Sequence, residues 1–361
     1  MGFDAREPYN DLPDLPPGME IETKNVLRAC IGTSRALAEL KGAGRTIPNQ
    51  AILINAIPLH EAKLSSEIEN IVTTQDELYS ASIGTEQEVS PQTKEVLRYR
   101  TALWEGYRQV AKGSLTLKML ERLCSIILDE EIRFRKEEYV YIGNRKRNTK
   151  TYTPPLGAKV IAAKLRNLAK YFGKSIPFDP LICITLVHYQ FEAIHPFTDG
   201  NGRTGRILSI LQLIRYGLLD IPVLYMSKAI IESKAEYYKR LRAVTEDHDW
   251  ERWILYMLTA IEQTALESRT RIDDIGKLLI DTVELCRDKL PKNVYSKELV
   301  ELIFEQPYCK IRFLEDAGIA KRQAASEYLQ ELEAIGVLEG EKVGREVVYK
   351  NPALLKVLTK S

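Results

Sequence analysis

The chain has 361 residues and a formal net charge of +1, with 45% hydrophobic and 28% charged residues. This length predicts two or three domains with a sizeable core, and the composition is that of an ordinary globular protein. The balanced charge gives no global field for binding nucleic acid or a membrane, and no apolar run approaches the ~20 residues of a membrane span. Five scattered cysteines without CxxC spacing, and an amino terminus unlike a signal or transit peptide, lead us to expect a cytoplasmic protein with reduced thiols.

The first third of the chain predicts mostly helices. Residues 1–20 are rich in proline and are expected to run extended over the surface. Helical periodicity follows over residues 22–41, and the glycines within 42–44 predict that this helix ends there. An apolar segment then covers residues 47–71, and two more helices are expected within 92–128.

A hairpin is predicted where the sequence texture changes, within residues 134–155. The segments 139–142 and 151–153 are rich in Tyr, Val and Thr, and they flank a basic turn. We expect the turn residues 145–147 to be solvated.

Two buried helices are predicted on either side of residue 200. Asp179 and Pro180 are the residue types expected at an N-cap and a first helical turn. Apolar residues recur at helical spacing before His195 and after Arg206, and Gly217 ends the second helix. The run His195–Arg206, which reads HPFTDGNGRTGR, therefore connects the two helices.

This connection has the chemistry of a phosphate site. The first N–H groups of a helix lack internal acceptors, and Gly200–Gly202 lets a phosphate approach them closely. Arg203 and Arg206 add guanidinium groups that suit phosphate oxygens. Asp199 would repel phosphate unless a cation such as Mg²⁺ bridged them, and His195 can accept a proton near neutral pH. The combination indicates attack by a hydroxyl on a metal-bound nucleotide phosphate.

Residue by residue, this run resembles the motif of the Fic (Fido) family, His-x-Phe-x-Asp/Glu-Gly-Asn-Gly-Arg-x-x-Arg, at every fixed position. The resemblance implies a mostly α fold, a helical core that transfers AMP from ATP to a Ser, Thr or Tyr hydroxyl of a target protein. It implies that His195 is the general base, that Asp199 holds Mg²⁺ or Mn²⁺, and that Phe197 anchors the loop. The implied ATP and phosphate contacts are Gly200, Asn201, Gly202, Arg203, Thr204, Gly205 and Arg206.

The segment from Ser65 to Asn70 has two interpretations. Ser66 and Glu69 have the spacing of a capping box at a helix start. The segment also resembles the Ser/Thr-x-x-x-Glu-Gly/Asn inhibitory helix of many Fic proteins, in the arrangement where this helix precedes the core (class II). That resemblance implies that Glu69 pairs with Arg206 and inhibits the enzyme.

Two further parts of the site come from the same resemblance. The predicted hairpin resembles the family's flap, with Ile142 and Gly143 in the expected places, and its edge could hold a target segment by strand addition. Tyr237 and Tyr238, expected in one helix covering residues 230–244, match the border of the adenine pocket, Tyr238 better. The family often has asparagine near Thr245, which this chain lacks.

The C-terminal segment resembles a winged-helix domain. Residues 296–304, 311–317 and 321–335 predict three short helices, and 337–339 with 346–349 predict a hairpin. Residues 292 to 361 contain 11 Lys and Arg and 11 Asp and Glu, so the net charge is 0. DNA binding requires several phosphates to be neutralised, and we therefore favour protein contact or self-association.

The predicted organisation has four parts. An N-terminal domain covers residues 1–110, with the inhibitory helix near 64–72. The Fic core with its hairpin flap covers 111–265, a helical connection covers 266–291, and the remainder is the winged-helix-like domain (α+β).

The predicted function is AMP transfer from ATP to a target protein, self-modification included, restrained by Glu69. Two alternatives stay open: a de-AMPylating hydrolase with the same site, and a DNA-binding regulator that senses nucleotide. The oligomeric state stays open too, a homodimer included.

Overall fold

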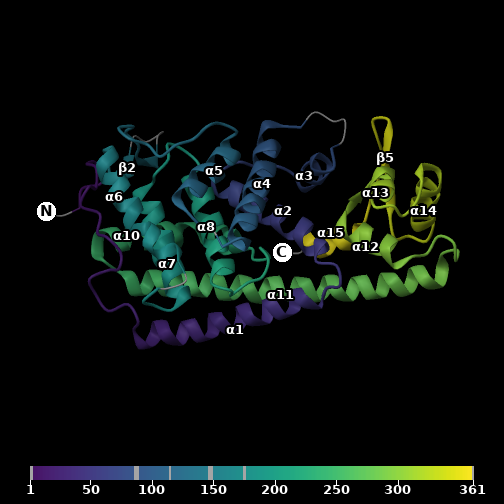
Figure 1. The fold of residues 1–361 in the computed structure, drawn as a ribbon, viewed down its shortest axis with the longest axis horizontal. Helices are drawn as coiled ribbons and strands as arrows, with labels where there is room; N and C mark the ends of the chain where they lie inside the picture. Colours follow the sequence, from purple (N-terminus) through teal and green to yellow (C-terminus); the bar gives the residue numbers. More distant parts are fainter. Residues whose placement is uncertain (1–2, 85–88, 114, 145–148, 174–175, 360–361) are drawn as a thin grey trace.

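The computed structural model describes residues 3–359 except 85–88, 114, 145–148 and 174–175, so the basic turn at 145–147 lies outside the described residues. The fold is mostly helical with two small antiparallel sheets, as predicted (Figure 1). The helices are α1 (Lys24–Thr46), α2 (Ala51–Ile68), α3 (Gln75–Ser82), α4 (Pro91–Ala111), α5 (Leu117–Leu128), α6 (Ala158–Ala169), the 3-10 helix η2 (Lys170–Phe172), α7 (Pro180–Ile194), α8 (Asn201–Arg215), α9 (Met226–Glu232), α10 (Lys234–Asp247), α11 (Trp250–Lys289), α12 (Lys297–Glu305), α13 (Ile311–Asp316), α14 (Arg322–Ala334) and α15 (Pro352–Thr359). The strands are β1 (Ile142–Asn144), β2 (Thr149–Tyr152), β3 (Tyr308–Cys309), β4 (Glu339–Val343) and β5 (Glu346–Lys350).

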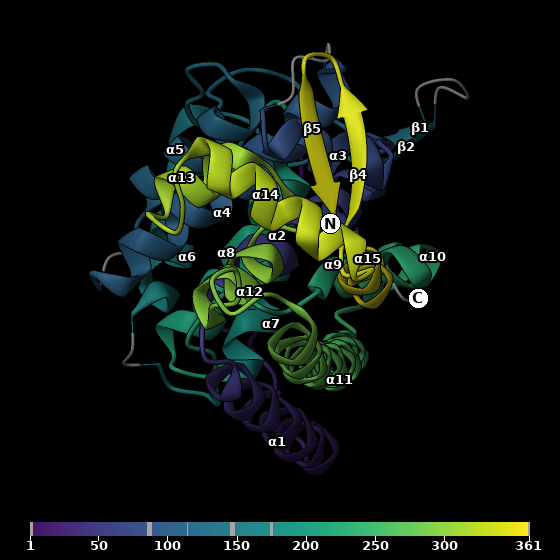
Figure 2. The ribbon, with the colours of Figure 1, turned by 90° about the vertical axis from the view of Figure 1, so that its right-hand side faces the viewer.

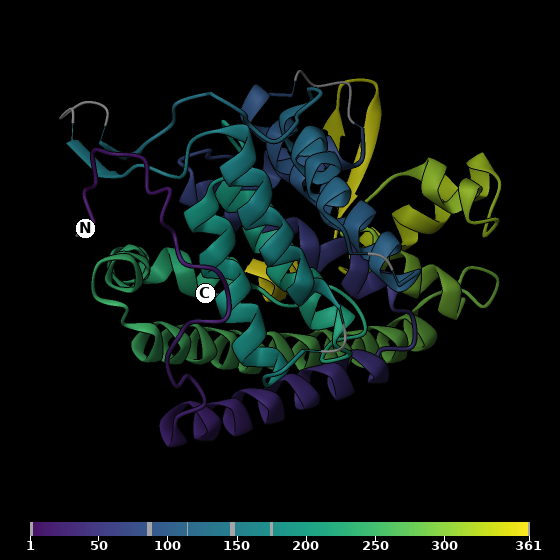
Figure 3. The same cartoon turned by 60° about the vertical axis from the view of Figure 1, so that its left-hand side comes forward.

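The long helix α11 runs along the lower side of the molecule in Figure 1, and α1 lies alongside and below it (Figures 1 and 3). The predicted end of the first helix at residues 42–44 is wrong, because α1 continues to Thr46. Glycine in a helix interior costs about 1 kcal/mol relative to alanine. Burial of the apolar face of α1, including Leu37 and Leu40, outweighs that cost. Helix α11 runs without interruption across residues 265 and 266, where we placed the boundary between the Fic core and the helical connection.

The two helices that flank the phosphate motif lie in the middle of the core. Asp179 caps α7 by accepting a hydrogen bond from Leu181 N at 2.8 Å, as its sequence position predicts. Most residues of α7 and α8 are buried on every face, and α4, α5 and α2 pack around α8. Gly200, with a φ of 78°, is the N-cap of α8, and Gly217, with a φ of 76°, follows its C-cap. The motif is therefore held rigidly from both sides.

The predicted hairpin is present as β1 and β2. The strands are antiparallel, with Ile142 opposite Tyr152 and Gly143 opposite Lys150, and an irregularity separates the two pairs. The predicted helix over residues 230–244 is instead two helices, α9 and α10, which meet at Ser233.

The C-terminal unit has the predicted three helices and hairpin (Figure 2). The order of its sheet is β3-β5-β4. Strand β3 and helix α15, which follows the hairpin, were not predicted from the sequence. This unit lies at the end of α11 away from the flap (Figure 1) and packs on α2 and α3. Tyr308 stacks on Tyr79 with ring centroids 5.3 Å apart, and Lys350 pairs with Asp76 at 3.1 Å.

Candidate active site

His195 is held at the end of α7 by an arginine from the segment before the flap. His195 is the C-cap of α7 and has left-handed backbone angles, with φ 49° and ψ 60°. Arg135 donates from Nε to His195 O at 2.7 Å and from Nη2 to Ile194 O at 2.9 Å. Its backbone N–H donates to Pro196 O at 2.9 Å. Arg135 thus engages three successive carbonyls, satisfying helix-end acceptors that would otherwise lack partners.

The rest of the loop is fixed by Phe197 and Asn201. Phe197 is fully buried and stacks on Phe134 with centroids 5.2 Å apart. The Asn201 side chain donates to Phe197 O and accepts from Phe197 N, both at 2.9 Å. The side-chain amide of Asn201 therefore stabilises the loop. The backbone N–H of Asn201 is the group that this residue presents at the N-terminus of α8.

A cavity of about 250 Å³ lies at that N-terminus. It is lined by Glu69, Tyr139, Val140, Tyr141, His195, Thr198, Asp199, Gly200, Asn201, Gly202 and Arg203. The structure thus brings together Glu69 and most of the predicted motif residues. Thr204, Gly205 and Arg206 do not line this cavity: the Thr204 and Arg206 side chains are buried, and Gly205 lies against Phe191 and Glu192.

Gly202 is the position at which the cavity has no space for a side chain. A Cβ added there would lie 2.4 Å from Glu69 Oε1 and 2.9 Å from Arg206 Nη1. Glycine therefore allows a charged group to lie against the first turn of α8, where backbone N–H groups favour an anion. In this structure the Glu69 carboxylate lies in that place.

Both motif arginines are buried and paired with carboxylates. Arg203 and Arg206 side chains are each 2% exposed. Arg203 forms an ion pair with Glu95 of α4. Arg206 Nη2 lies 2.9 Å from Glu69 Oε1, and Arg206 also donates to Ser65 Oγ at 2.8 Å and Ser65 O at 2.9 Å.

The capping-box interpretation of Ser66 and Glu69 is wrong. Glu69 is the C-cap of α2 rather than a residue of a first turn, and Ser66 lies inside the same helix. Lys234 Nζ donates to Ile68 O at 2.5 Å, which holds this helix end against α10. Burial by itself would raise the pKa of Glu69, but the Arg206 guanidinium lowers it below its ordinary value. Glu69 is therefore ionised at neutral pH.

The electrostatics of the site keep His195 neutral. Burial lowers the pKa of His195 to about 4, and the charge of Arg135 acts in the same direction. The backbone of Glu192 and the charges of Glu69 and Asp199 act the other way. A neutral imidazole is the form that can accept a proton.

Asp199 is placed where a cation could join it to a phosphate. Its side chain is 75% exposed, and Oδ1 accepts from Gly200 N at 2.6 Å. No group of three or more His, Cys, Asp and Glu with the arrangement of a metal site occurs among the described residues. Mg²⁺ fits this setting, because it commonly binds one or two carboxylates and completes its shell with waters and substrate phosphates.

A second cavity of about 640 Å³ lies between the flap, α7 and α10. Tyr238, which we predicted to border the adenine, lines it together with the flap residues Ile142 and Gly143 and with Tyr152 and Glu192. Tyr237 does not line it: this residue is 2% exposed and its hydroxyl lies 2.8 Å from His188 Nε2. Tyr237 is thus a core residue, and Tyr238, 42% exposed, is the aromatic that a base could contact.

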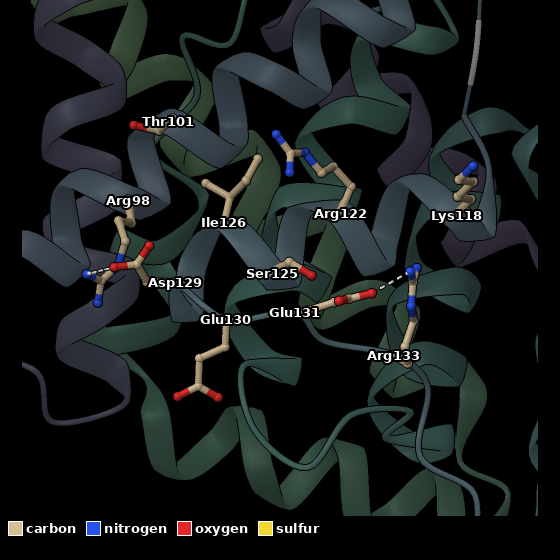
Figure 4. Close-up of a pocket in the computed structure, with 10 residues that line it drawn as sticks. All are labelled: Arg98, Thr101, Lys118, Arg122, Ser125, Ile126, Asp129, Glu130, Glu131 and Arg133. Atoms are coloured by element: carbon tan, nitrogen blue, oxygen red, sulfur yellow. Dashed lines mark hydrogen bonds and ion pairs between the residues drawn. The ribbon is translucent and has the colours of Figure 1, made fainter.

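A third cavity, of about 780 Å³, lies between α4 and α5 and is shown in Figure 4. Its charged side chains include two ion pairs, Arg98 with Asp129 at 3.4 Å and Arg133 with Glu131 at 2.7 Å. None of the predicted site residues lines it. We therefore assign the chemistry to the two cavities next to His195.

Sequence reasoning missed several residues that organise the site. Arg135, Ser65, Glu95 and Glu192 are ordinary charged or polar residues in the sequence, and nothing periodic marks them. Only Ser65 carried a signal, since it is the first residue of the segment that resembles an inhibitory helix.

Each helix within the described parts of the chain is too short or too polar to cross a lipid bilayer.

The chain matches three family models. The matches are Fic/DOC family N-terminal over residues 27–108, Fic/DOC family over 114–213, and Protein adenylyltransferase SoFic-like, C-terminal domain, over 278–354. A Fido domain-containing protein of Dictyostelium discoideum is 38% identical over 109 residues, which are 30% of this chain and 67% of that protein.

Two further relatives extend the likeness. Protein adenylyltransferase fic-1 of Caenorhabditis elegans is 32% identical over 104 residues, which are 27% of this chain and 19% of that protein. The chain thus spans about a fifth of the length of such curated relatives. The crystal structure of a Fic family protein from Desulfovibrio desulfuricans superposes with a TM-score of 0.57 at 17% identity, covering 93% of this chain and 98% of that one. This last likeness establishes the fold.

Proposed function

This chain belongs to the Fic/DOC family, and we propose that it is a protein adenylyltransferase that moves AMP from ATP to a hydroxyl of a target protein. The observation that carries the proposal is the cavity at the start of α8. There a neutral His195, an exposed Asp199 and a glycine-lined helix N-terminus lie together. The names of the curated relatives, protein adenylyltransferases, support the same activity.

The chemistry follows from these groups. The acceptor hydroxyl gives its proton to the neutral imidazole of His195 as its oxygen attacks the α-phosphorus of ATP. The bond between the α-phosphorus and the oxygen that bridges to the β-phosphorus breaks, and pyrophosphate leaves. The N–H groups of α8 and the motif arginines hold the phosphates so that the attack is in line. Mg²⁺ or Mn²⁺ held by Asp199 would neutralise phosphate charge.

We propose that Glu69 restrains this activity. Its carboxylate lies 2.9 Å from Arg206 and fills the space next to Gly202, where phosphate oxygens would lie. ATP that binds beside Glu69 would have its terminal phosphates displaced, so that the α-phosphorus is not in line with the hydroxyl. The inhibition is thus competition between a carboxylate and a phosphate for one guanidinium group.

The flap supplies a place for the target segment. The edge of the β1–β2 hairpin lies beside the cavity that Ile142 and Gly143 line. An extended segment added to this edge would present its hydroxyl toward His195. The target is therefore a protein with an accessible Ser, Thr or Tyr, and another copy of this chain qualifies. The five buried, unpaired cysteines are in keeping with a cytoplasmic enzyme.

The test is AMP transfer by a His195→Ala variant. With labelled ATP, the variant should lose transfer by about 10²–10⁴-fold, because a positioned base contributes this much to the rate. ATP binding should persist, since the phosphate contacts come from α8 and the arginines. Near-native transfer by His195→Ala would exclude His195 as the base. DNA binding, measured in parallel at increasing salt, should stay weak.

A further inference from the structure

Glu192 is a partly buried carboxylate that the proposed reaction does not use. It lies on α7, one turn before His195, and it lines the 640 Å³ cavity beside Tyr238. Its Oε1 is buried without a hydrogen-bond partner. Burial raises the pKa of Glu192 to about 7, and the nearby charge of Arg206 opposes that rise. An unpartnered buried acceptor is costly, and because the Glu192 side chain also lines the cavity, a ligand that donates a hydrogen bond to this carboxylate would offset that cost.

Several other polar groups of this cavity already have partners. The Tyr152 hydroxyl donates to Ala193 O at 2.7 Å, and the hydroxyls of Tyr189 and Thr245 lie 2.9 Å apart. Lys239 and Arg242 pair with Glu236 and Glu246 on the outer surface of α10. The Glu192 carboxylate, by contrast, has no hydrogen-bond partner at Oε1.

The position of Glu192 identifies the part of a nucleotide that would reach it. A Cβ added to Gly205, in the first turns of α8, would lie 2.5 Å from Glu192 Oε1. Glu192 also lines the same cavity as Tyr238. Glu192 thus lies between the phosphate site and the aromatic residue that a base could contact. In any nucleotide, the group between phosphate and base is the sugar.

We propose that Glu192 is a specificity-determining residue that accepts a hydrogen bond from the vicinal ribose hydroxyls and so selects ribonucleotides over deoxyribonucleotides. This inference rests on the proposed function, since it takes the ligand to be a nucleoside triphosphate. A carboxylate is an acceptor only, and the ribose hydroxyls are donors that deoxyribose partly lacks. Acidic side chains perform the same recognition in dinucleotide-binding folds. The hydrogen bond also favours the ionised carboxylate, which burial disfavours.

The proposal predicts a sugar preference that one side chain controls. The dissociation constants of ATP, 2′-deoxy-ATP, 3′-deoxy-ATP and CTP are measured by calorimetry in the Glu69→Gly background, where the phosphate site is open. ATP should bind about 10- to 100-fold more tightly than at least one deoxy analogue, because a site built to bond a hydroxyl rejects the analogue that lacks it.

The variants then assign this preference. Glu192→Leu should bring the ratio of deoxy-ATP to ATP dissociation constants close to 1, whereas Glu192→Gln, which keeps an acceptor oxygen, should retain a preference. Lys239→Gln, which alters a charge on the rim of the same cavity, should leave the ratio unchanged. The ratio of the ATP and CTP dissociation constants should be the same in the Glu192→Leu variant as in its parent.

These outcomes distinguish recognition of the sugar from recognition of the base and from AMP transfer. The inference is overturned if the parent shows no sugar preference, if Glu192→Leu keeps it, or if Glu192→Leu changes the base ratio instead. Unfolding temperatures identify a misfolded variant, and the parent's own preference still tests the inference in that case. Because binding is measured without turnover, a failure of AMP transfer would refute the proposed function without altering this result.

Discussion

Removing the Glu69 carboxylate should activate the enzyme. The perturbation is Glu69→Gly, which takes away the partner 2.9 Å from Arg206 Nη2 and vacates the space beside Gly202. No catalytic group is added, so any gain in rate must come from release of the phosphate site. A gain would therefore identify the Glu69–Arg206 contact as the restraint.

The size of the effect follows from the contact. A hydrogen bond to a charged group contributes about 1.5–3 kcal/mol, which is about 10- to 100-fold in an equilibrium constant. The Arg206 side chain is 2% exposed, but that of Glu69 is 34% exposed, so solvent weakens the pair. Ser65 also still holds Arg206 through two hydrogen bonds. We therefore expect the lower part of the range, about 10- to 30-fold more AMP transfer.

The assay is incorporation of label from α-labelled ATP into the protein itself and into the proteins of a lysate. Glu67→Gly is the matched control: Glu67 lies on the same helix, its side chain is also 34% exposed, and its partner is Lys63 rather than a motif residue. Wild type and Glu67→Gly should be equally slow. If Glu69→Gly is no faster than these two on any protein, the assignment of Glu69 as an inhibitory residue is refuted.

Four further predictions concern the same site. Arg206→Ala should not activate the enzyme, although it breaks the same ion pair, because it removes a phosphate contact; transfer above the wild-type level in the labelling assay would contradict this. Asp199→Ala and excess chelator should each impair transfer, and full activity in chelator would exclude a metal requirement. The acid limb of the pH–rate profile should lie near pH 4, where His195 becomes protonated, and Arg135→Met should move it upward by removing a positive charge. Between about pH 6.5 and 4, His195 binds a proton in the unfolded chain but not in the folded one. Lowering the pH through this window should therefore decrease the free energy of unfolding, measurable as a lower unfolding temperature.

The sequence by itself determined the local geometry of the motif. Residues 195 to 206 are contiguous, and the cap at Asp179 and the glycines at 200 and 217 fix where the flanking helices begin and end. When chemistry is carried by consecutive residues between two buried helices, the local chain brings those residues together. The helices and hairpin of the C-terminal unit could be predicted for the same reason, since their signals are periodic and short-range.

Only the tertiary structure decided which distant groups complete the site. Arg135 reaches His195 across 60 residues of sequence, and Glu95 reaches Arg203 across 108. The Glu69–Arg206 pair, separated by 137 residues, could be anticipated from resemblance but not from pattern. Packing also keeps α1 helical at Gly42 and Gly44, although glycine has a low helix propensity. A hydrogen-bond partner far along the chain leaves no period in the sequence, because it depends on how the helices pack. For the same reason, only the packing of α7, α8 and α10 shows that Glu192 Oε1 lacks a hydrogen-bond partner.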